Sequence, residues 1–338
     1  MKRKAAFLAM MLGAALLAPG APPAQAQAPM KLVLAPPGIP PIFGSIIVFV
    51  AKDEGFFKKY GVDVDLRQFD NGTAASRAVL AGDIDASMSP TPLLIAQVAN
   101  AGVPLQAIYG FPKPDFELGT TDLKAAKCAD LKGQQVGVDT PGGARSIALK
   151  GILAGGCHMS INDVQQVALG SNTAQAMIAG QIKYGILHLD DVPEIESRGK
   201  KVAIVKTLAE SNPVSHWIVI EARKDRIAQK REAFVRMLAG VIAAGHYMEN
   251  PANADRVAKI AEVTGRSYKI ALGALKSYLK FGLWAVDNDG LKEAQLDKLI
   301  AFQAKSGSIK PGKKPPTYSQ IADPSLWKDA NALYEKSH

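Results

Sequence analysis

The sequence predicts an α/β protein of two lobes, each a mostly parallel sheet flanked by helices. Short β-branched segments alternate with helical patterns over residues 31–206. A helix, a glycine and a strand at 78–86 recur as a similar segment at 176–184. Proline-containing breaks at 109–114 and 211–215 mark changes in the alternation. Because a strand–helix–strand series forms a parallel sheet with covered faces, two such series predict two lobes with a cleft between them.

The expected elements follow in chain order. The first series has strands at 31–35, 62–67, 85–88 and 105–109, with helices at 42–59, 74–81 and 92–100. The second has strands at 135–139, 164–169, 184–189 and 201–206, with helices at 144–154 and 173–179. A further strand is expected at 217–221. Beyond it, apolar residues recur at helical spacing, which predicts a helical C-terminal region whose apolar faces are core.

The N-terminus has the layout of a secretory signal peptide. Lys2, Arg3 and Lys4 precede an apolar stretch at 5–18, and a cleavage site after Ala26 follows, with Ala28 as a second fitting position. The apolar stretch is shorter than the about 20 residues that span a bilayer. The sequence therefore predicts a signal peptide at 1–26 and a periplasmic protein that is not embedded in a membrane.

Composition favours an ordinary globular protein and excludes several functional classes. The chain is 48% hydrophobic and 21% charged, and its 40 Lys and Arg against 31 Asp and Glu give a net charge of +9. These basic residues are not clustered with aromatic residues, so no nucleic-acid partner is expected. The sequence holds no G-x-S-x-G or H-E-x-x-H motif and no cysteine with an evident activating base, so we expect neither an enzyme nor a cofactor.

The two cysteines, Cys128 and Cys157, lie in a chain expected to be exported, where oxidation is permitted. A disulfide between them is the expected arrangement. The alternative is a metal or redox site that recruits the adjacent His158, but such a centre needs further ligands at suitable spacing. We expect no metal site.

Several motifs resemble a known family. Residues 51–64, AKDEGFFKKYGVDV, resemble the signature A-x-E-x-G-F-F-x-x-x-G-L-x-V of substrate-binding proteins that serve ABC importers of nitrate, sulfonates, taurine and thiamine-pyrimidine precursors. Residues 80–86, 130–138 and 179–182 are similar to further motifs of that family. The resemblance implies a type II periplasmic binding fold, with lobe I at 27–110 and 214–338, lobe II at 111–213, and the C-terminal helices packed on lobe I. The two proline-containing breaks are the expected hinges.

In open α/β sheets, ligands bind beyond the carboxyl ends of the strands, so the loops there supply the candidate site. The candidates from lobe I are Gly38, Ile39, Phe43, Ser45, Asn71, Thr73, Ser89 and Thr91. Phe43 can lie against a planar ligand or be buried beneath the sheet. The hydroxyl and amide groups are also explained by capping of the helices that follow them.

The candidates from lobe II begin with a glycine-containing turn that opens a helix: Thr140, Gly142, Gly143 and Arg145. Free N–H groups and the helix dipole favour an anion there, and Arg145 can add a bidentate contact or face solvent. The turn lacks a P-loop lysine, so nucleotide binding is not indicated. His188 and Asp190 at a strand end complete the set, although Asp190 can equally cap the next helix.

The function predicted from these features is capture of a small anionic or polar organic solute, such as a sulfonate, a carboxylate or a heterocycle, by closure of a monomeric two-lobe receptor. The resemblance implies delivery to an ABC transporter permease. One alternative is an enzyme of the same fold like the pyrimidine-precursor synthases, whose cysteine-rich signature this sequence does not show. Another is a receptor that reports its ligand to a chemoreceptor or sensor kinase.

Overall fold

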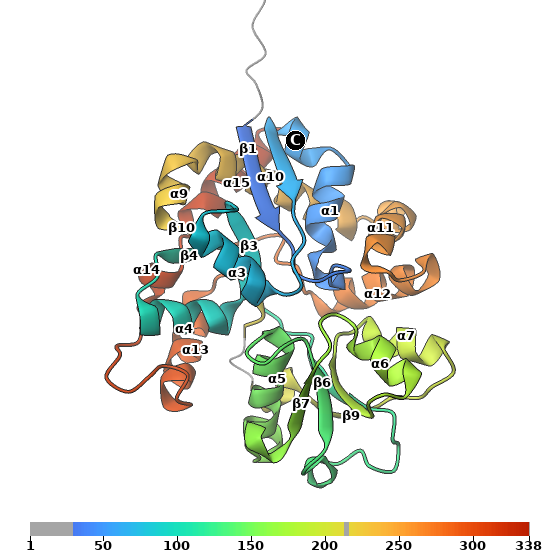
Figure 1. Cartoon of the computed structure of the whole chain (residues 1–338). Coiled ribbons are helices and arrows are strands. Elements are labelled where there is room, and N and C mark those ends of the chain that lie inside the picture. The colour runs from blue at the N-terminus through green and yellow to red at the C-terminus, as the bar shows by residue number, and fades with distance from the viewer. Residues whose placement is uncertain (1–29, 213–215, 338) are drawn as a thin grey trace, which may run out of the picture.

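The computed structural model describes residues 30–212 and 216–337 and contains two five-stranded sheets with helices packed on them (Figure 1). The strand orders are β2-β1-β3-β10-β4 and β7-β6-β8-β5-β9. The predicted fold class is confirmed. We call the part built on the first sheet lobe I and the part built on the second sheet lobe II. The expected signal peptide and the residues 213–215 of the second break lie outside the described residues.

The first sheet holds four parallel strands and one antiparallel strand, β10, which is fourth in the order. Strands β1, β2 and β3 run parallel, whereas β10 is inserted antiparallel between β3 and β4. The strands are β1 (Met30–Ala35), β2 (Val62–Leu66), β3 (Ala86–Pro90), β4 (Leu105–Phe111) and β10 (Ile218–Arg223). Its helices are η1 (Phe43–Ser45), α1 (Ile46–Asp53), α2 (Phe56–Lys59), α3 (Gly72–Ala81) and α4 (Thr91–Ala101).

The second sheet repeats this arrangement. Strands β6, β7 and β8 run parallel, and β5 is inserted antiparallel between β8 and β9. The strands are β5 (Glu117–Thr120), β6 (Gln135–Val138), β7 (Gln165–Ala168), β8 (Tyr184–Leu187) and β9 (Ala203–Thr207). Its helical elements are η2 (Cys128–Leu131), α5 (Ala144–Ile152), η3 (Leu153–Cys157), η4 (Ile161–Asp163), α6 (Thr173–Ala179), α7 (Asp191–Ser197) and α8 (Leu208–Ser211).

The C-terminal helices pack on lobe I. The long helix α10 (Arg231–Glu249) contacts α1, β1 and β2, and its apolar side chains, such as Phe234 and Leu238, are buried. This burial fits the helical spacing of apolar residues in the sequence. The remaining elements are α9 (Lys224–Gln229), η5 (Pro251–Asn253), α11 (Ala254–Ala261), η6 (Glu262–Thr264), α12 (Tyr268–Phe281), α13 (Glu293–Lys305), α14 (Tyr318–Ile321) and α15 (Ser325–Glu335).

The recurring segment of the sequence occupies equivalent places in the two sheets. Helices α3 and α6 end at Gly82 and Gly180, whose φ angles of +84° and +76° lie in the left-handed region that glycine adopts without steric cost. Each glycine leads into the third strand of its sheet's order, β3 or β8. The prediction of two lobes with similar topology is confirmed.

Differences from the sequence prediction include a divided helix in lobe I and an additional strand in lobe II. The helix expected at 42–59 is divided, because α1 ends at Asp53 and Gly55 adopts a left-handed φ of +75° before α2. Strand β5 was not predicted, since its four residues, ELGT, include a glycine and lack an apolar alternation. It is nevertheless inserted between β8 and β9.

Lobe II carries the disulfide that the sequence predicts. Cys128 of η2 and Cys157 of η3 are joined, with their Cα atoms 5.3 Å apart. The bond ties the end of the helix α5 to the segment before β6. The two passages between the sheets are residues 112–116, between β4 and β5, and 208–217, between β9 and β10. The lobe boundaries predicted at 110 and 213 stay a prediction.

Candidate functional site

Loops from both sheets line one cavity between the lobes. From lobe I come the loops after β1 and β2, with Gly38 and Asn71, and Pro90 at the end of β3. From lobe II come residues after β6, β7 and β8, with Asp139, Ser171 and His188. The cavity has a volume of about 30 Å³. It lies at the carboxyl ends of the parallel strands, where ligands bind in open α/β sheets. We call it the central cleft.

Eight of the predicted site residues line the central cleft or the spaces beside it. Gly38, Asn71, Arg145 and His188 line the cleft itself. Phe43 and Asp190 line a neighbouring cavity of about 20 Å³, together with Arg145 and His188. Ile39 and Thr140 line an opening of about 270 Å³, together with Asn71 and Ser171. Residues far apart in the sequence are therefore brought together.

The other predicted residues make contacts within the protein. The hydroxyl of Ser45 donates to Ile42 O, Ser89 lies 2.7 Å from the carboxylate of Glu221, and Thr91 lies 2.8 Å from Nδ1 of His216. Thr73 donates across the cleft to the carbonyl of Gly142 at 3.4 Å, and Gly142 N donates to Ser146. A Cβ atom at Gly143 would collide with Oδ2 of Asp139, so any other residue there requires this carboxylate to move.

Two helices begin at the central cleft, one from each lobe. Asn71 accepts a hydrogen bond from Ala74 N and so caps α3, which leaves its Nδ2 group unused by that cap. Across the cleft, α5 begins at Ala144, which also lines the cavity. Helix N-termini favour negative charge. The buried carboxylate of Asp139 lies beside the start of α5 and already supplies some of that charge.

Arg145 is buried, with 4% of its surface exposed, so the alternative that it faces solvent is wrong. Its Nη1 lies 3.0 Å from Oδ2 of Asp191 and also donates to the carbonyl of Ile186. The guanidinium lines the central cleft, but its charge is already partnered. An anionic ligand would therefore share Arg145 with a carboxylate.

A buried network of charges joins the two lobes. Arg266, which precedes α12 of lobe I, pairs with Asp190 and Asp191 at the start of α7 in lobe II. The hydroxyl of Tyr278, on α12, lies 2.5 Å from Oδ2 of Asp115 and 2.9 Å from Oδ1 of Asp190, and its one proton is shared between these two acceptors. Nδ1 of His188 lies 3.0 Å from Asp115, which belongs to the first passage between the sheets. These contacts hold α12 against α7 (Figure 1).

The protonation of the network follows from its opposing charges. Burial alone would raise the pKa of Asp191, but Arg145, Arg266 and His188 outweigh it and hold the pKa well below its ordinary value. Burial would likewise lower the pKa of Arg266, whereas Asp190 and Asp191 raise it. Burial, with the charges of Asp115 and Asp190, raises the pKa of Tyr278 well above its ordinary value. The tyrosine hydroxyl therefore keeps its proton and acts as a donor.

Sequence reasoning missed three members of this network: Asp115, Arg266 and Tyr278. Asp115 comes directly after 109–114, the segment interpreted as a hinge, and was not among the candidates. Tyr278 lies on a helix whose apolar face was interpreted as core, and its ring is indeed buried against Phe43 with centroids 5.1 Å apart. A buried tyrosine hydroxyl needs a partner, which is the signal that was available.

His216, at the second passage between the sheets, gives a testable pH dependence. Its Nε2 lies 2.8 Å from Gly290 O, and burial lowers its pKa from 6.5 to about 4. Between these two pH values the unfolded chain binds the proton and the folded chain does not, so this histidine makes stability fall as the pH falls from 6.5 to 4. Protonation of this histidine in the unfolded chain alone lowers the free energy of unfolding by about 3 kcal/mol once the pH is below both pKa values.

Glu117 acts in the opposite direction. Burial, with Asp115 and Glu210, raises its pKa from 4.5 to about 7, so its contribution to stability falls as the pH rises through that window.

The His216 effect is therefore measured as a difference between wild type and His216→Gln, which retains a donor for Gly290. Urea unfolding at pH 4.5 and 6.5 should show a smaller acid-induced loss in the variant. Equal losses in both proteins would contradict the assignment.

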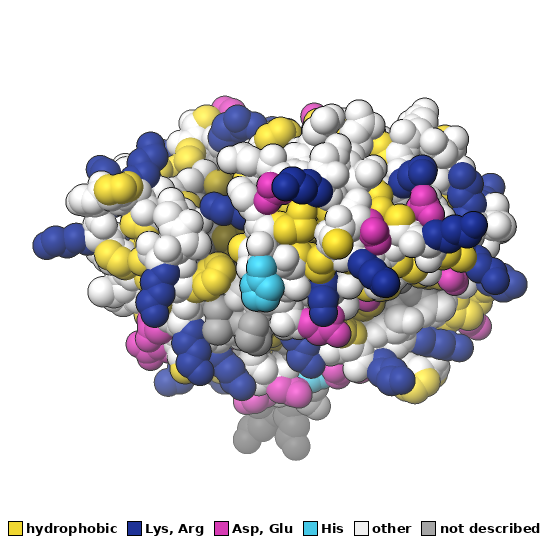
Figure 2. Space-filling model, turned by 90° about the horizontal axis from the view of Figure 1, so that it is seen from below, with side chains coloured by type: hydrophobic (Ala, Val, Ile, Leu, Met, Phe, Trp, Pro, Cys, Tyr) yellow, Lys and Arg dark blue, Asp and Glu magenta, His cyan; other side chains and the backbone are white. Residues whose placement is uncertain are grey.

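The described residues contain no group of three or more His, Cys, Asp or Glu side chains placed to hold a metal ion. Within the same residues, no helix is both long and apolar enough to cross a membrane. On the face drawn in Figure 2, Lys and Arg side chains are spread around the outline and interspersed with acidic ones. Basic charge on this face is dispersed, without one dominant cluster.

Comparisons with known proteins agree with this architecture. A protein of Brucella abortus (strain 2308), named as a candidate binding protein, is 25% identical over 293 residues, which cover 82% of this chain and 86% of that protein. The periplasmic nitrate-binding protein NrtA of Synechocystis PCC 6803 has a similar structure, with a TM-score of 0.71 at 14% identity, covering 91% of this chain and 89% of that one.

The alkanesulfonate-binding protein SsuA of Xanthomonas axonopodis pv. citri, solved with MOPS bound, is also similar, with a TM-score of 0.69 at 15% identity, covering 88% of this chain and 99% of that one. These neighbours have the periplasmic binding protein fold, which confirms the type II fold that the sequence resemblance implied. The family model described as NMT1/THI5 like matches residues 43–254. The chain belongs to the NMT1/THI5-like family.

Proposed function

We propose that this protein is a periplasmic solute-binding protein that captures a small organic solute between its lobes and delivers it to an ABC transporter permease. The observation that carries the proposal is the central cleft, which loops from both sheets line at the carboxyl ends of their parallel strands. The family and the names of the structural neighbours, a nitrate-binding and an alkanesulfonate-binding protein, support it.

The cleft favours a solute with a polar or anionic group. Asn71 and Ser171 offer side-chain hydrogen bonds, and the N-termini of α3 and α5 offer backbone N–H groups. The pairing of Arg145 with Asp191 removes the one basic side chain that the sequence had offered as a free anion ligand. Sulfonates, carboxylates and uncharged heterocycles therefore all belong in a binding panel.

Closure of the lobes about the two passages, 112–116 and 208–217, is the proposed binding motion. The charged network between α7 and α12 and the Thr73–Gly142 contact stabilise the arrangement in which the lobes touch. A solute that contacts both lobes shifts the balance further toward this arrangement, because it binds the closed form better than the open form. A monomer that releases the solute chemically unchanged is part of the proposal.

Titration calorimetry with a panel of sulfonates, carboxylates and neutral heterocycles tests the function. At least one compound should bind with a Kd in the micromolar range or tighter, which corresponds to about −8 kcal/mol or better. The Asn71→Ser variant keeps an oxygen to cap α3 but loses the amide donor, so it should bind that compound about three- to tenfold more weakly. Asn250→Ser, a matched change at the cap of η5, should bind as wild type does.

Mass spectrometry of the bound compound and small-angle scattering complete the test. The compound should be recovered unaltered, and the radius of gyration should not rise when it binds. Recovery of a converted product would support the enzyme alternative instead. A panel that yields neither heat nor a thermal shift would contradict the proposal.

A further inference from the structure

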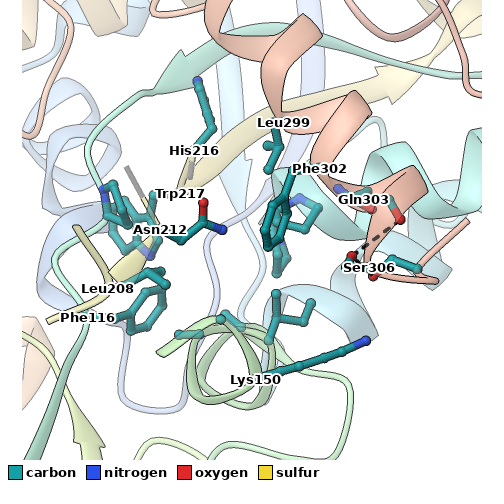
Figure 3. A pocket seen from close by; sticks show the side chains of 18 of the residues that line it. Phe116, Lys150, Leu208, Asn212, His216, Trp217, Leu299, Phe302, Gln303 and Ser306 are labelled. Atoms are coloured by element: carbon teal, nitrogen blue, oxygen red, sulfur yellow. Dashed lines mark hydrogen bonds between the residues drawn. The ribbon is translucent and has the colours of Figure 1, made fainter. Parts of the chain in front are cut away.

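An apolar chamber of about 80 Å³ adjoins the central cleft (Figure 3). Ile147 and Ala148 of α5 line it from lobe II, and Leu299 and Phe302 of α13 line it from lobe I. Figure 3 shows the rings of Phe116 and Trp217, from the two passages between the sheets, on the side opposite Phe302 and Gln303. The chamber is therefore built from both lobes and both passages.

The chamber shares part of its wall with the central cleft. Pro90, Phe116, Ala144 and Trp217 line both spaces. The two spaces are therefore adjacent, and a solute that occupies both of them has to pass these side chains. One water molecule needs about 10–15 Å³ of a volume measured in this way. A chamber of about 80 Å³ therefore has room for roughly five to eight atoms of that size, not counting hydrogens.

Two polar side chains of the chamber are buried without partners among the described residues. Gln303 is 3% exposed, and neither its Nε2 nor its Oε1 makes a hydrogen bond. Trp217 is 2% exposed, and its Nε1 donates to no acceptor. Buried polar groups are nearly always paired, so an unpaired carboxamide and an unpaired indole N–H in one chamber indicate a missing partner. A carboxamide offers donors and an acceptor together, so its complement carries both as well.

The surroundings select against a charged group at Gln303. Of the described residues lining the chamber, Lys150 is the one with a permanent charge, and its side chain is exposed. The other lining side chains, such as Leu299, Phe302 and Ile147, are apolar or neutral. An ionised group without a buried counter-charge would be disfavoured there.

We propose that the solute carries a compact neutral ring amide, of the lactam or cyclic imide class, which fills this chamber and pairs its N–H and C=O with the carboxamide of Gln303. The Trp217 N–H binds an acceptor of the same solute where the chamber meets the central cleft. The proposal rests on the solute-binding function above and narrows its substrate class. Leu299, Phe302 and Gln303 lie beyond residue 254, where the family match ends, so the chamber is partly built from residues outside the matched region.

Three ring probes of similar size test the pairing in the full mature chain: δ-valerolactam, cyclohexanone, which lacks the N–H, and cyclopentanecarboxylate, which is charged. Ligand-observed NMR competition should show δ-valerolactam binding at least fivefold more tightly than the other two. Gln303→Met should remove this preference while retaining cyclohexanone binding. Lys298→Met, an exposed position on the same helix, should keep it.

A second measurement does not depend on any ligand. Because methionine replaces an unpaired buried amide with an apolar group of similar shape, Gln303→Met should raise the Tm of the free protein. A lowered Tm would mean that the Gln303 carboxamide has a partner within the protein. Equal affinity for δ-valerolactam and cyclohexanone would mean that the protein makes no hydrogen bond to the ring N–H. Either result overturns the proposal. If a panel solute binds wild type but Gln303→Met leaves its affinity unchanged, the chamber proposal fails while the solute-binding function stands. If no panel solute binds, the function itself fails.

Discussion

Replacing Arg266 with methionine is expected to weaken the contact between the lobes by about 3–5 kcal/mol, the usual cost of breaking a buried ion pair from one side. Arg266 is the partner that lobe I supplies to Asp190 and Asp191 of lobe II. Its loss leaves Asp190 with a tyrosine hydroxyl and, among the residues that the structure describes, no cation at pairing distance. The carboxylate can recover its hydration only if the lobes separate.

Separation of the lobes in Arg266→Met can be measured in two ways. The radius of gyration of the ligand-free protein should rise, because a change of this size shifts a closed-to-open ratio by about a hundredfold or more. Urea unfolding should show a loss of stability in parallel. Arg231→Met is the matched control, because Arg231 forms an exposed pair with Asp329 that contributes about 1 kcal/mol or less. An unchanged radius together with unchanged stability in Arg266→Met would contradict the role of the network.

The double variant Cys128→Ser, Cys157→Ser is expected to unfold with a free energy about 3.5 kcal/mol lower than that of the oxidised protein. The bond closes a loop across a sequence separation of 29 residues, and the loss follows from the greater freedom of the unfolded chain. Because both cysteines lie in lobe II, the effect should appear first as loss of structure in that lobe.

Urea unfolding under non-reducing conditions measures this difference, and hydrogen exchange locates it. Wild type treated with a reductant is the internal control and should match the double variant. If oxidised and reduced wild type unfold at the same urea concentration, the disulfide does not stabilise the native state, and the prediction is wrong.

The architecture could be predicted from the sequence because short stretches of sequence indicate most of its helices and strands. The glycines that end α3 and α6, the alternation of β-branched and helical segments, and the apolar faces of the C-terminal helices are all visible within short windows. Strand β5 was missed for the converse reason. Its residues carry little strand preference of their own, and its place between β8 and β9 comes from tertiary pairing.

The site was predictable only in part. The candidate loops were chosen because ligands bind beyond the carboxyl ends of strands in open α/β sheets. Residues of these loops, such as Asn71 and His188, do line the central cleft. Arg266 and Gln303 could not be found that way, because they come from the C-terminal helical region and reach the lobe interface only through packing. The charge of Arg145 was visible in the sequence, whereas its pairing with Asp191 depends on two loops meeting in three dimensions.

The inserted strand β10 makes the first sheet depend on a later part of the chain than the second sheet does. All five strands of lobe II lie between residues 117 and 207, so its sheet needs no segment beyond that stretch. In lobe I, β3 and β4 are each bonded to β10, at 218–223. Until that segment arrives, both strands keep unpaired edges of the kind that invites aggregation. The lobe that begins the chain is thus the last to be finished.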